Sequence, residues 1–89
     1  MLNIENISFI VIHCTDSSRD FTTFEQVNYW HKSNGWKSER SGINIGYHFF
    51  LNGKGQIFEG RKFYGKEVEK GAAQYGLNDK AIGICLALA

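Results

Sequence analysis

The sequence predicts an α/β domain in which a mixed β-sheet of about four strands carries one main amphipathic helix. Two apolar runs rich in β-branched or small side chains, at residues 8–14 and 81–88, and a hairpin pattern at residues 46–59 supply the strands. A helical pattern at residues 22–35 lies between the first run and the hairpin. Because 89 residues form one domain at most, we expect residues 1–89 to be a single domain with a thin core.

Residues 8–14 are too short for a stable helix and are therefore interpreted as a buried strand. Side chains alternate between the two faces of a strand. One face carries Phe9, Val11 and His13, and the other carries Ile10, Ile12 and Cys14.

The helix is predicted to begin at Thr22, because a threonine N-cap followed three residues later by Glu25 forms a capping box. Its apolar stripe consists of Phe24, Val27 and Trp30, with Phe21 just before the cap. Gly35 is a typical C-terminal stop. His31 lies beside Trp30 and is expected to be partly exposed.

The second half of the chain contains the strongest local signal. Residues 46–51 and 56–59 are predicted strands, and the connector Asn52-Gly53-Lys54-Gly55 suits a tight hairpin turn. Residues 61–74 could be a loop or a short irregular helix, and the alternating charges of Lys66 to Lys70 indicate a solvated face. Residues 81–88 are apolar on both faces, which favours a central strand.

Composition argues against several classes of partner. Ten basic and nine acidic residues leave a net charge of +1, which gives no electrostatic case for nucleic acid or an anionic membrane. The longest apolar run is too short to span a bilayer, and the N-terminus lacks the pattern of a signal peptide, so we expect synthesis in the cytoplasm and no membrane insertion. Cys14 and Cys85 lie in apolar runs and are expected to be buried thiols, with a disulfide or metal role as a secondary interpretation.

A few residues could carry chemistry. His13 at a strand end could hold a metal or simply bond a loop. Tyr47 and His48 are neighbours on a strand, so only one can share a pocket with His13. Trp36 could stack on a sugar or pack helix against sheet. Arg61 could bind a carboxylate or lie at a solvated hairpin end.

Five segments, in order and at similar spacing, resemble the zinc-dependent N-acetylmuramoyl-L-alanine amidases of the phage-lysozyme type, which share a fold with animal peptidoglycan recognition proteins. They cover nearly the whole chain. The segments are Ile12-His13-Cys14-Thr15; Tyr29-Trp30-His31 with Asn34-Gly35-Trp36; Ile45-Gly46-Tyr47-His48-Phe49; Gly55-Gln56-Ile57-Phe58-Glu59-Gly60-Arg61; and Gly76-Leu77-Asn78 with Ala81-Ile82-Gly83-Ile84-Cys85-Leu86.

The resemblance implies hydrolysis of the amide between muramic acid and the first L-alanine of the stem peptide, with zinc polarising the carbonyl and activating water. It makes His13 the first zinc ligand and Tyr47 the catalytic residue beside the metal. Thr15, Trp36 and Arg61 are the implied substrate-binding residues, and peptidoglycan is the implied partner. Action on the cell wall would follow release of the protein from the cytoplasm.

The chain also departs from the family pattern. In the family, the second and third zinc ligands and a helix follow the strand equivalent to residues 81–86, so we expect a C-terminally shortened domain that lacks most of the zinc site. Ala73 stands where a histidine is common. An apolar sheet surface should be uncovered, which favours a homo-oligomer or a protein partner over it. Alternatives to the amidase are a non-catalytic peptidoglycan-binding module and a regulatory protein that binds another protein through the same surface.

Overall fold

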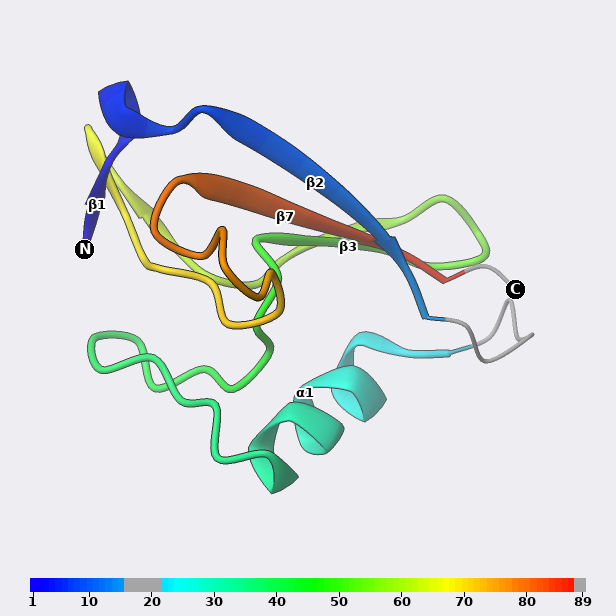
Figure 1. The fold of residues 1–89 in the computed structure, drawn as a ribbon. Helices are drawn as coiled ribbons and strands as arrows, with labels where there is room; N and C mark the ends of the chain where they lie inside the picture. Colours follow the sequence, from blue (N-terminus) through cyan, green and yellow to red (C-terminus); the bar gives the residue numbers. More distant parts are fainter. Residues whose placement is uncertain (16–21, 88–89) are drawn as a thin grey trace.

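The computed structural model describes residues 1–15 and 22–87, which form two sheets and one α-helix (Figure 1). The larger sheet has the order β2-β7-β3-β4 and the smaller one the order β1-β6-β5. The strands are β1 (Leu2–Asn3), β2 (Phe9–Cys14), β3 (Phe49–Leu51), β4 (Ile57–Glu59), β5 (Phe63–Tyr64), β6 (Glu67–Val68) and β7 (Ala81–Leu86), and the helices are the 3₁₀ turn η1 (Ile4–Asn6) and α1 (Phe24–Ser33).

The larger sheet is mixed, as predicted. β7 lies between β2 and β3 and runs parallel to both, while β3 and β4 form an antiparallel hairpin. The central position predicted for the last strand is therefore confirmed. In register, Cys85 of β7 faces His13 on one side and Phe50 on the other.

Helix α1 covers one face of this sheet, and the core lies between them (Figure 1). The core residues come from the helix, from the strands and from the segment before β3. They are Val27, Ile45, Phe50, Cys85 and Ala87, with Phe24, Ile43, Tyr47 and Phe58 packed against them.

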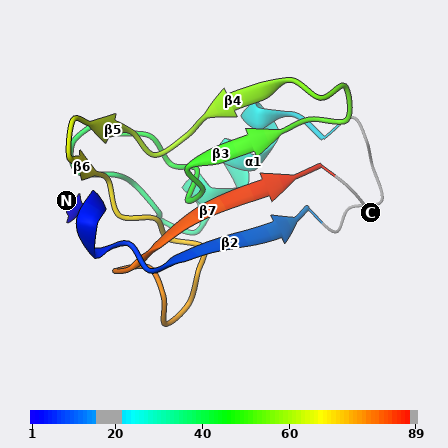
Figure 2. The same cartoon turned by 90° about the horizontal axis from the view of Figure 1, so that it is seen from above.

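The opposite face of the sheet is uncovered by any helix in the described part of the chain, as the view from above shows (Figure 2). Ile10, Ile12 and Ile57 are 67, 65 and 67% exposed. β2 is therefore an edge strand with one exposed apolar face, and its interpretation as a buried strand is wrong for this face. The uncovered apolar surface that we expected is present.

Helix α1 begins one residue later than predicted. Thr23, not Thr22, is the N-cap: its Oγ1 accepts a hydrogen bond from Gln26 N, and Gln26 Oε1 accepts one from Thr23 N, both at 3.1 Å. Gln26 thus completes the capping box in place of Glu25. Gly35 follows the C-cap with φ of +77°, so the predicted stop is confirmed.

The buried stripe of α1 also differs from the prediction. Val27 and His31, four residues apart, are buried, whereas Trp30 is exposed. The helix is oriented in this way because the ring of His31 reaches the segment before β3, where Gly46 N donates to Nδ1 at 2.8 Å. Phe21, expected before the cap, lies outside the described residues.

The predicted hairpin is confirmed, but its first strand is shorter. A bend at His48 delays β3 to Phe49. Residues 61–74 form no helix; β5 and β6 pair there instead, and β6 also pairs with β1. Val68 and Glu69 are buried, so the interpretation of Lys66 to Lys70 as a solvated face is wrong for these two residues. No helix among residues 1–15 and 22–87 has the length and apolarity needed to cross a bilayer.

Candidate functional site

Four aromatic side chains meet on the helix-covered side of the sheet, towards the end of β2. The ring centroids of His13 and Tyr47 are 5.0 Å apart, those of Tyr47 and His31 5.2 Å, and those of His31 and Trp36 4.6 Å. Because Tyr47 precedes the bend at His48, it lies on the same side as Phe50. Tyr47 is thus the neighbour of His13, and His48 is not.

His13 has the property expected of a ligand nitrogen. Its Nε2 atom is buried and has no hydrogen-bond partner in the described structure. Burial lowers the pKa of His13, so the ring is neutral at pH 7. A neutral imidazole with an unpaired nitrogen suits metal coordination.

The described residues do not complete a metal site around it. Residues 1–15 and 22–87 contain no group of three His, Cys, Asp or Glu side chains that could hold an ion. A tightly bound zinc ion needs three or four protein ligands. His13 therefore fits zinc as a single ligand, and the described residues alone do not fit the whole ion.

Tyr47 keeps its proton. Burial, reinforced by the neighbouring thiol of Cys85, raises the pKa of Tyr47 well above its usual value of 10. Burial likewise raises the pKa of the Cys85 thiol to about 11. The tyrosine is thus a neutral hydrogen-bond donor beside His13, which is the form that can stabilise negative charge on an oxygen.

His31 is the site residue that sequence reasoning missed: the side chain is buried, so the expectation that it is partly exposed is wrong. Burial lowers the pKa of His31 to about 4, with Arg61 and His13 adding to the effect. Its Nδ1 accepts the Gly46 N–H at 2.8 Å, so a neutral ring carries its proton on Nε2. The spacing of four residues from Val27 could have placed it on the buried stripe.

His48 serves the backbone rather than the site. Gly83 N donates to its Nδ1 at 3.0 Å, and its Nε2 lies 2.7 Å from the carbonyl oxygen of Glu69, to which it donates as a neutral ring. Both ring nitrogens are thus used. Cys85 is buried as predicted, but Cys14 is an exposed free thiol because it belongs to the uncovered face.

The three residues expected to bind substrate lie in different places. Thr15 follows β2 and its N–H bonds Leu86 O at 3.0 Å. Trp36 is half-buried and packs edge-on against His31. Arg61 is only 5% exposed, so its interpretation as a solvated hairpin end is wrong. Its guanidinium is held by backbone carbonyls.

A cavity of about 530 Å³ opens between the start of α1 and the β3–β4 hairpin. β2 and β3 both run parallel to β7, so their C-terminal ends, and with them His13 and this cavity, lie at the same edge of the sheet. That edge is where α/β sheets commonly bind ligands. The lining residues are Thr22, Thr23, Phe24, Glu25, Asn52, Gly53, Lys54, Gln56 and Phe58.

Comparisons with known proteins agree with this picture. The family model for N-acetylmuramoyl-L-alanine amidase matches residues 3–88. The endolysin of Escherichia phage T7 is 29% identical over 83 residues, which are 92% of this chain and 48% of the endolysin.

Solved structures give the same result. The amidase LysC of Clostridium intestinale superposes with a TM-score of 0.74 at 31% identity, and bumblebee PGRP-SA with 0.70 at 30%; each covers 93% of this chain and 48% of the other. The chain thus spans about half the length of these relatives and has the fold of amidases and peptidoglycan recognition proteins over that half. By the match over residues 3–88, the chain belongs to the N-acetylmuramoyl-L-alanine amidase family.

Proposed function

We propose that this chain recognises peptidoglycan and supplies part of an amidase centre that cleaves the bond between muramic acid and L-alanine. The observation that carries the proposal is the unpartnered, buried Nε2 of His13 beside the protonated phenol of Tyr47. The 530 Å³ cavity at the same edge of the sheet offers room for a sugar or a peptide.

Each residue of the cluster has a separate role in this proposal. His13 would hold a zinc ion as one of its ligands, and the chemistry such an ion supplies is to polarise a carbonyl and activate water. Tyr47 donates a hydrogen bond to the oxygen on which negative charge develops. His31 positions Tyr47 by ring packing and stays neutral at pH 7. The remaining ligands would have to come from outside the described residues.

Thr15, Trp36 and Arg61 are proposed contacts for the glycan or the stem peptide. Thr15 follows the strand that carries His13, and Trp36 extends the aromatic cluster beyond His31. Peptidoglycan as substrate implies action on the cell wall after release from the cytoplasm in which the protein is made. We also propose that a second copy of the chain or another protein covers the uncovered apolar face of the sheet.

The decisive experiment combines zinc content with wall binding. Purified protein, His13→Ala and the matched control Cys14→Ala, which changes the next residue on the exposed face, are analysed for zinc and sedimented with insoluble peptidoglycan. We expect the parent protein and the control to bind about one zinc ion per zinc site and to release free stem peptide. His13→Ala should lose both the zinc and the release. Release of stem peptide that does not depend on His13 would contradict the proposed role of this residue.

A non-catalytic wall-binding module is the second candidate, and the lack of a three-ligand group among residues 1–15 and 22–87 favours it. It requires sedimentation with peptidoglycan that a chelator leaves unchanged, without release of peptide. Protein that stays in the supernatant at every wall concentration would contradict both candidates. A regulatory role through the uncovered face would then be the function to test, by isolating stoichiometric partners from host extract.

A further inference from the structure

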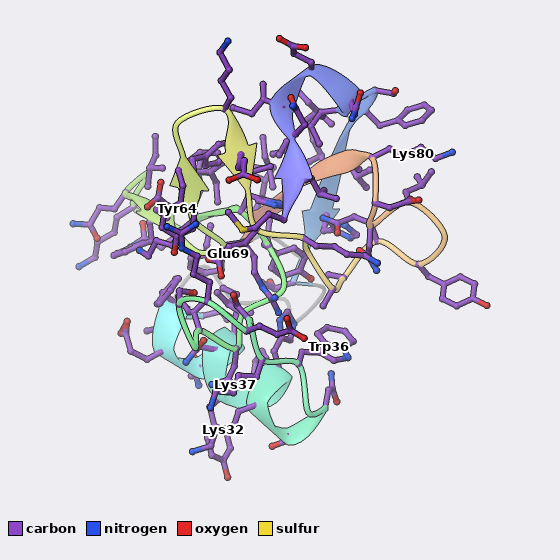
Figure 3. All side chains as sticks on the ribbon, turned by 90° about the vertical axis from the view of Figure 1, so that its left-hand side faces the viewer. Lys32, Trp36, Lys37, Tyr64, Glu69 and Lys80 are labelled. Carbon is purple, nitrogen blue, oxygen red and sulfur yellow. The ribbon has the colours of Figure 1, made fainter. Side chains whose placement is uncertain are left out.

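A second cavity lies at the other end of the sheet. Its volume is about 360 Å³. Figure 3 looks at the molecule from the side where β2 and β7 begin, and it labels Lys37 and Glu69, two of the lining residues. His13 is near the opposite end of β2, so this cavity is separate from the candidate amidase centre. It is lined by Met1, Lys37, Ser38, Glu39, Arg40, Arg61, Glu69, Lys70 and Gly71.

Arg61 lies in the wall of this cavity and is nearly fully buried. Three of its five N–H groups donate to backbone carbonyls: Nε to Ile45 O at 2.8 Å, Nη1 to Lys70 O at 3.1 Å and Nη2 to Asn44 O at 3.5 Å. One N–H on each terminal nitrogen therefore has no partner among the described residues. Such a pair can hold two oxygens of one carboxylate or phosphate.

The nearby carboxylate of Glu69 offsets part of the charge of Arg61, but it does not form an ion pair with the guanidinium. In the part of the chain that the structure describes, the single ion pair joins Lys62 to Glu59, so no carboxylate pairs directly with Arg61. Four cationic and two carboxylate side chains line the cavity, which leaves a formal side-chain charge of +2. A buried guanidinium without an ion partner is costly unless an anion reaches it.

The walls of the cavity are held in place before any ligand arrives. Glu69 accepts hydrogen bonds from Ser41 N at 3.1 Å, from Ser41 Oγ at 2.8 Å and from Lys62 N at 2.7 Å, which fixes the loop after Lys37. The guanidinium of Arg40 lies 3.7 Å from the centre of the Tyr64 ring. These hydrogen bonds occupy both oxygens of the Glu69 carboxylate, which therefore points to the loop and to the backbone of Lys62.

We propose that this cavity binds an oxyanion, a phosphate or carboxylate group, with Arg61 as the bidentate contact and Lys37 and Lys70 as rim charges. This proposal assigns Arg61, named above as a contact for the glycan or the stem peptide, to the second cavity, and it does not require hydrolysis at the amidase centre proposed at His13. It would give the protein a second point of attachment to an anionic ligand, such as a phosphate-bearing polymer or a peptide carboxylate.

The test is an NMR titration of ¹⁵N-labelled protein with sodium phosphate at pH 7 and constant ionic strength, with sodium acetate and sodium chloride as parallel arms. We expect saturating shifts confined to the amides of residues 37–41 and 69–71. Saturation by phosphate or by acetate identifies which oxyanion the site prefers. Shifts that are equally large with chloride, or that spread over the surface without saturating, would overturn the proposal, because they report charge screening only.

Two variants with opposite expected effects on affinity, and one control, keep the test decisive. Lys37→Gln with Lys70→Gln should weaken binding about fivefold, because two exposed charges are removed. The matched control, Lys54→Gln with Lys80→Gln, changes the net charge equally away from the cavity and should leave the affinity within about twofold. Glu39→Gln removes an opposing carboxylate and should tighten binding roughly twofold. Equal weakening by both double variants, or weaker binding in Glu39→Gln, refutes the site.

Discussion

The two faces of the larger sheet differ in how far their apolar side chains are exposed to solvent. Phe50 and Cys85 on one face are fully buried under α1, whereas Ile10 and Ile12 on the other are about two-thirds exposed. Both faces are apolar, so hydrophobicity alone does not distinguish them. What distinguishes them is that one helix covers a single face, and the stability of the fold should depend on that face.

The largest effect should come from Phe50. It packs against Phe24 and Phe58 with ring centroids 6.4 and 6.3 Å apart, and its truncation leaves a cavity that these rings cannot fill. Phe50→Ala should lower the free energy of unfolding by about 3–5 kcal/mol, measured by urea denaturation followed by circular dichroism. In a domain of this size such a loss is close to the total stability.

The matched variant on the other face is Ile57→Ala in β4, whose side chain is exposed. Its truncation should cost less than about 1 kcal/mol, because little area is returned to water. An equal loss of stability in both variants would mean that the exposed face is buried in solution, and that stability does not depend mainly on the face under α1.

A pH dependence should follow from His48, whose two bonds connect the start of β3 to β7 and to Glu69. Burial lowers the pKa of His48 from 6.5, with Arg61 adding to this and contacts with Glu69 opposing it. The unfolded state therefore binds more protons below pH 6.5, so this contribution to stability is complete above pH 6.5 and is lost as the pH falls through the lowered value.

Protonation would place an N–H on Nδ1 against the N–H of Gly83. We expect the free energy of unfolding to fall by roughly 1–3 kcal/mol between pH 7.5 and pH 5, measured by urea unfolding at several pH values. His48→Gln should start less stable but lose less over this range. An identical slope in the variant would assign the pH dependence to other groups.

A smaller effect should come from the start of α1, which determines how well the covered face is closed. Thr23→Ala removes the acceptor for Gln26 N and should cost about 1 kcal/mol. Ser33→Ala, at the exposed end of the same helix, should cost less than about 0.5 kcal/mol. Thermal unfolding followed by circular dichroism measures both variants, and an equal loss would mean that the cap does not limit helix stability.

Sequence patterns predict the helix and the strands better than they predict which faces of these elements are buried. The hairpin, the central strand and the helix follow from local rules such as Gly55 in the left-handed turn and Gly35 after the helix. Those rules do not reveal which apolar face another element covers. Ile10 and Val11 are equally apolar in sequence, yet only a tertiary fact, the position of α1, separates them.

The candidate site shows the same limit. Motif order pointed to His13 and Tyr47, but the bend at His48 that brings Tyr47 to His13 has no signature in the strand pattern. The sequence predicts solvated side chains for Arg61 and Glu69, because charged residues usually are exposed. Their burial depends partly on the carbonyl of Ile45, 16 residues from Arg61, and on the N–H and hydroxyl of Ser41, 28 residues from Glu69, which a local pattern does not contain.

The smallest effect on stability, and the clearest test of the comparison, should come from Ile12. Ile12→Ser lies on the exposed face of edge strand β2, and its cost should be within about 0.5 kcal/mol. Because a flat apolar edge strand tends to pair with other chains, the same substitution should reduce self-association, measured by sedimentation velocity over a range of concentrations. A monomeric parent protein would show that the exposed face is tolerated by an isolated chain, and a large loss of stability in Ile12→Ser would show that it is covered in solution. The two readouts together separate an exposed face from an interface, which burial within one chain cannot do.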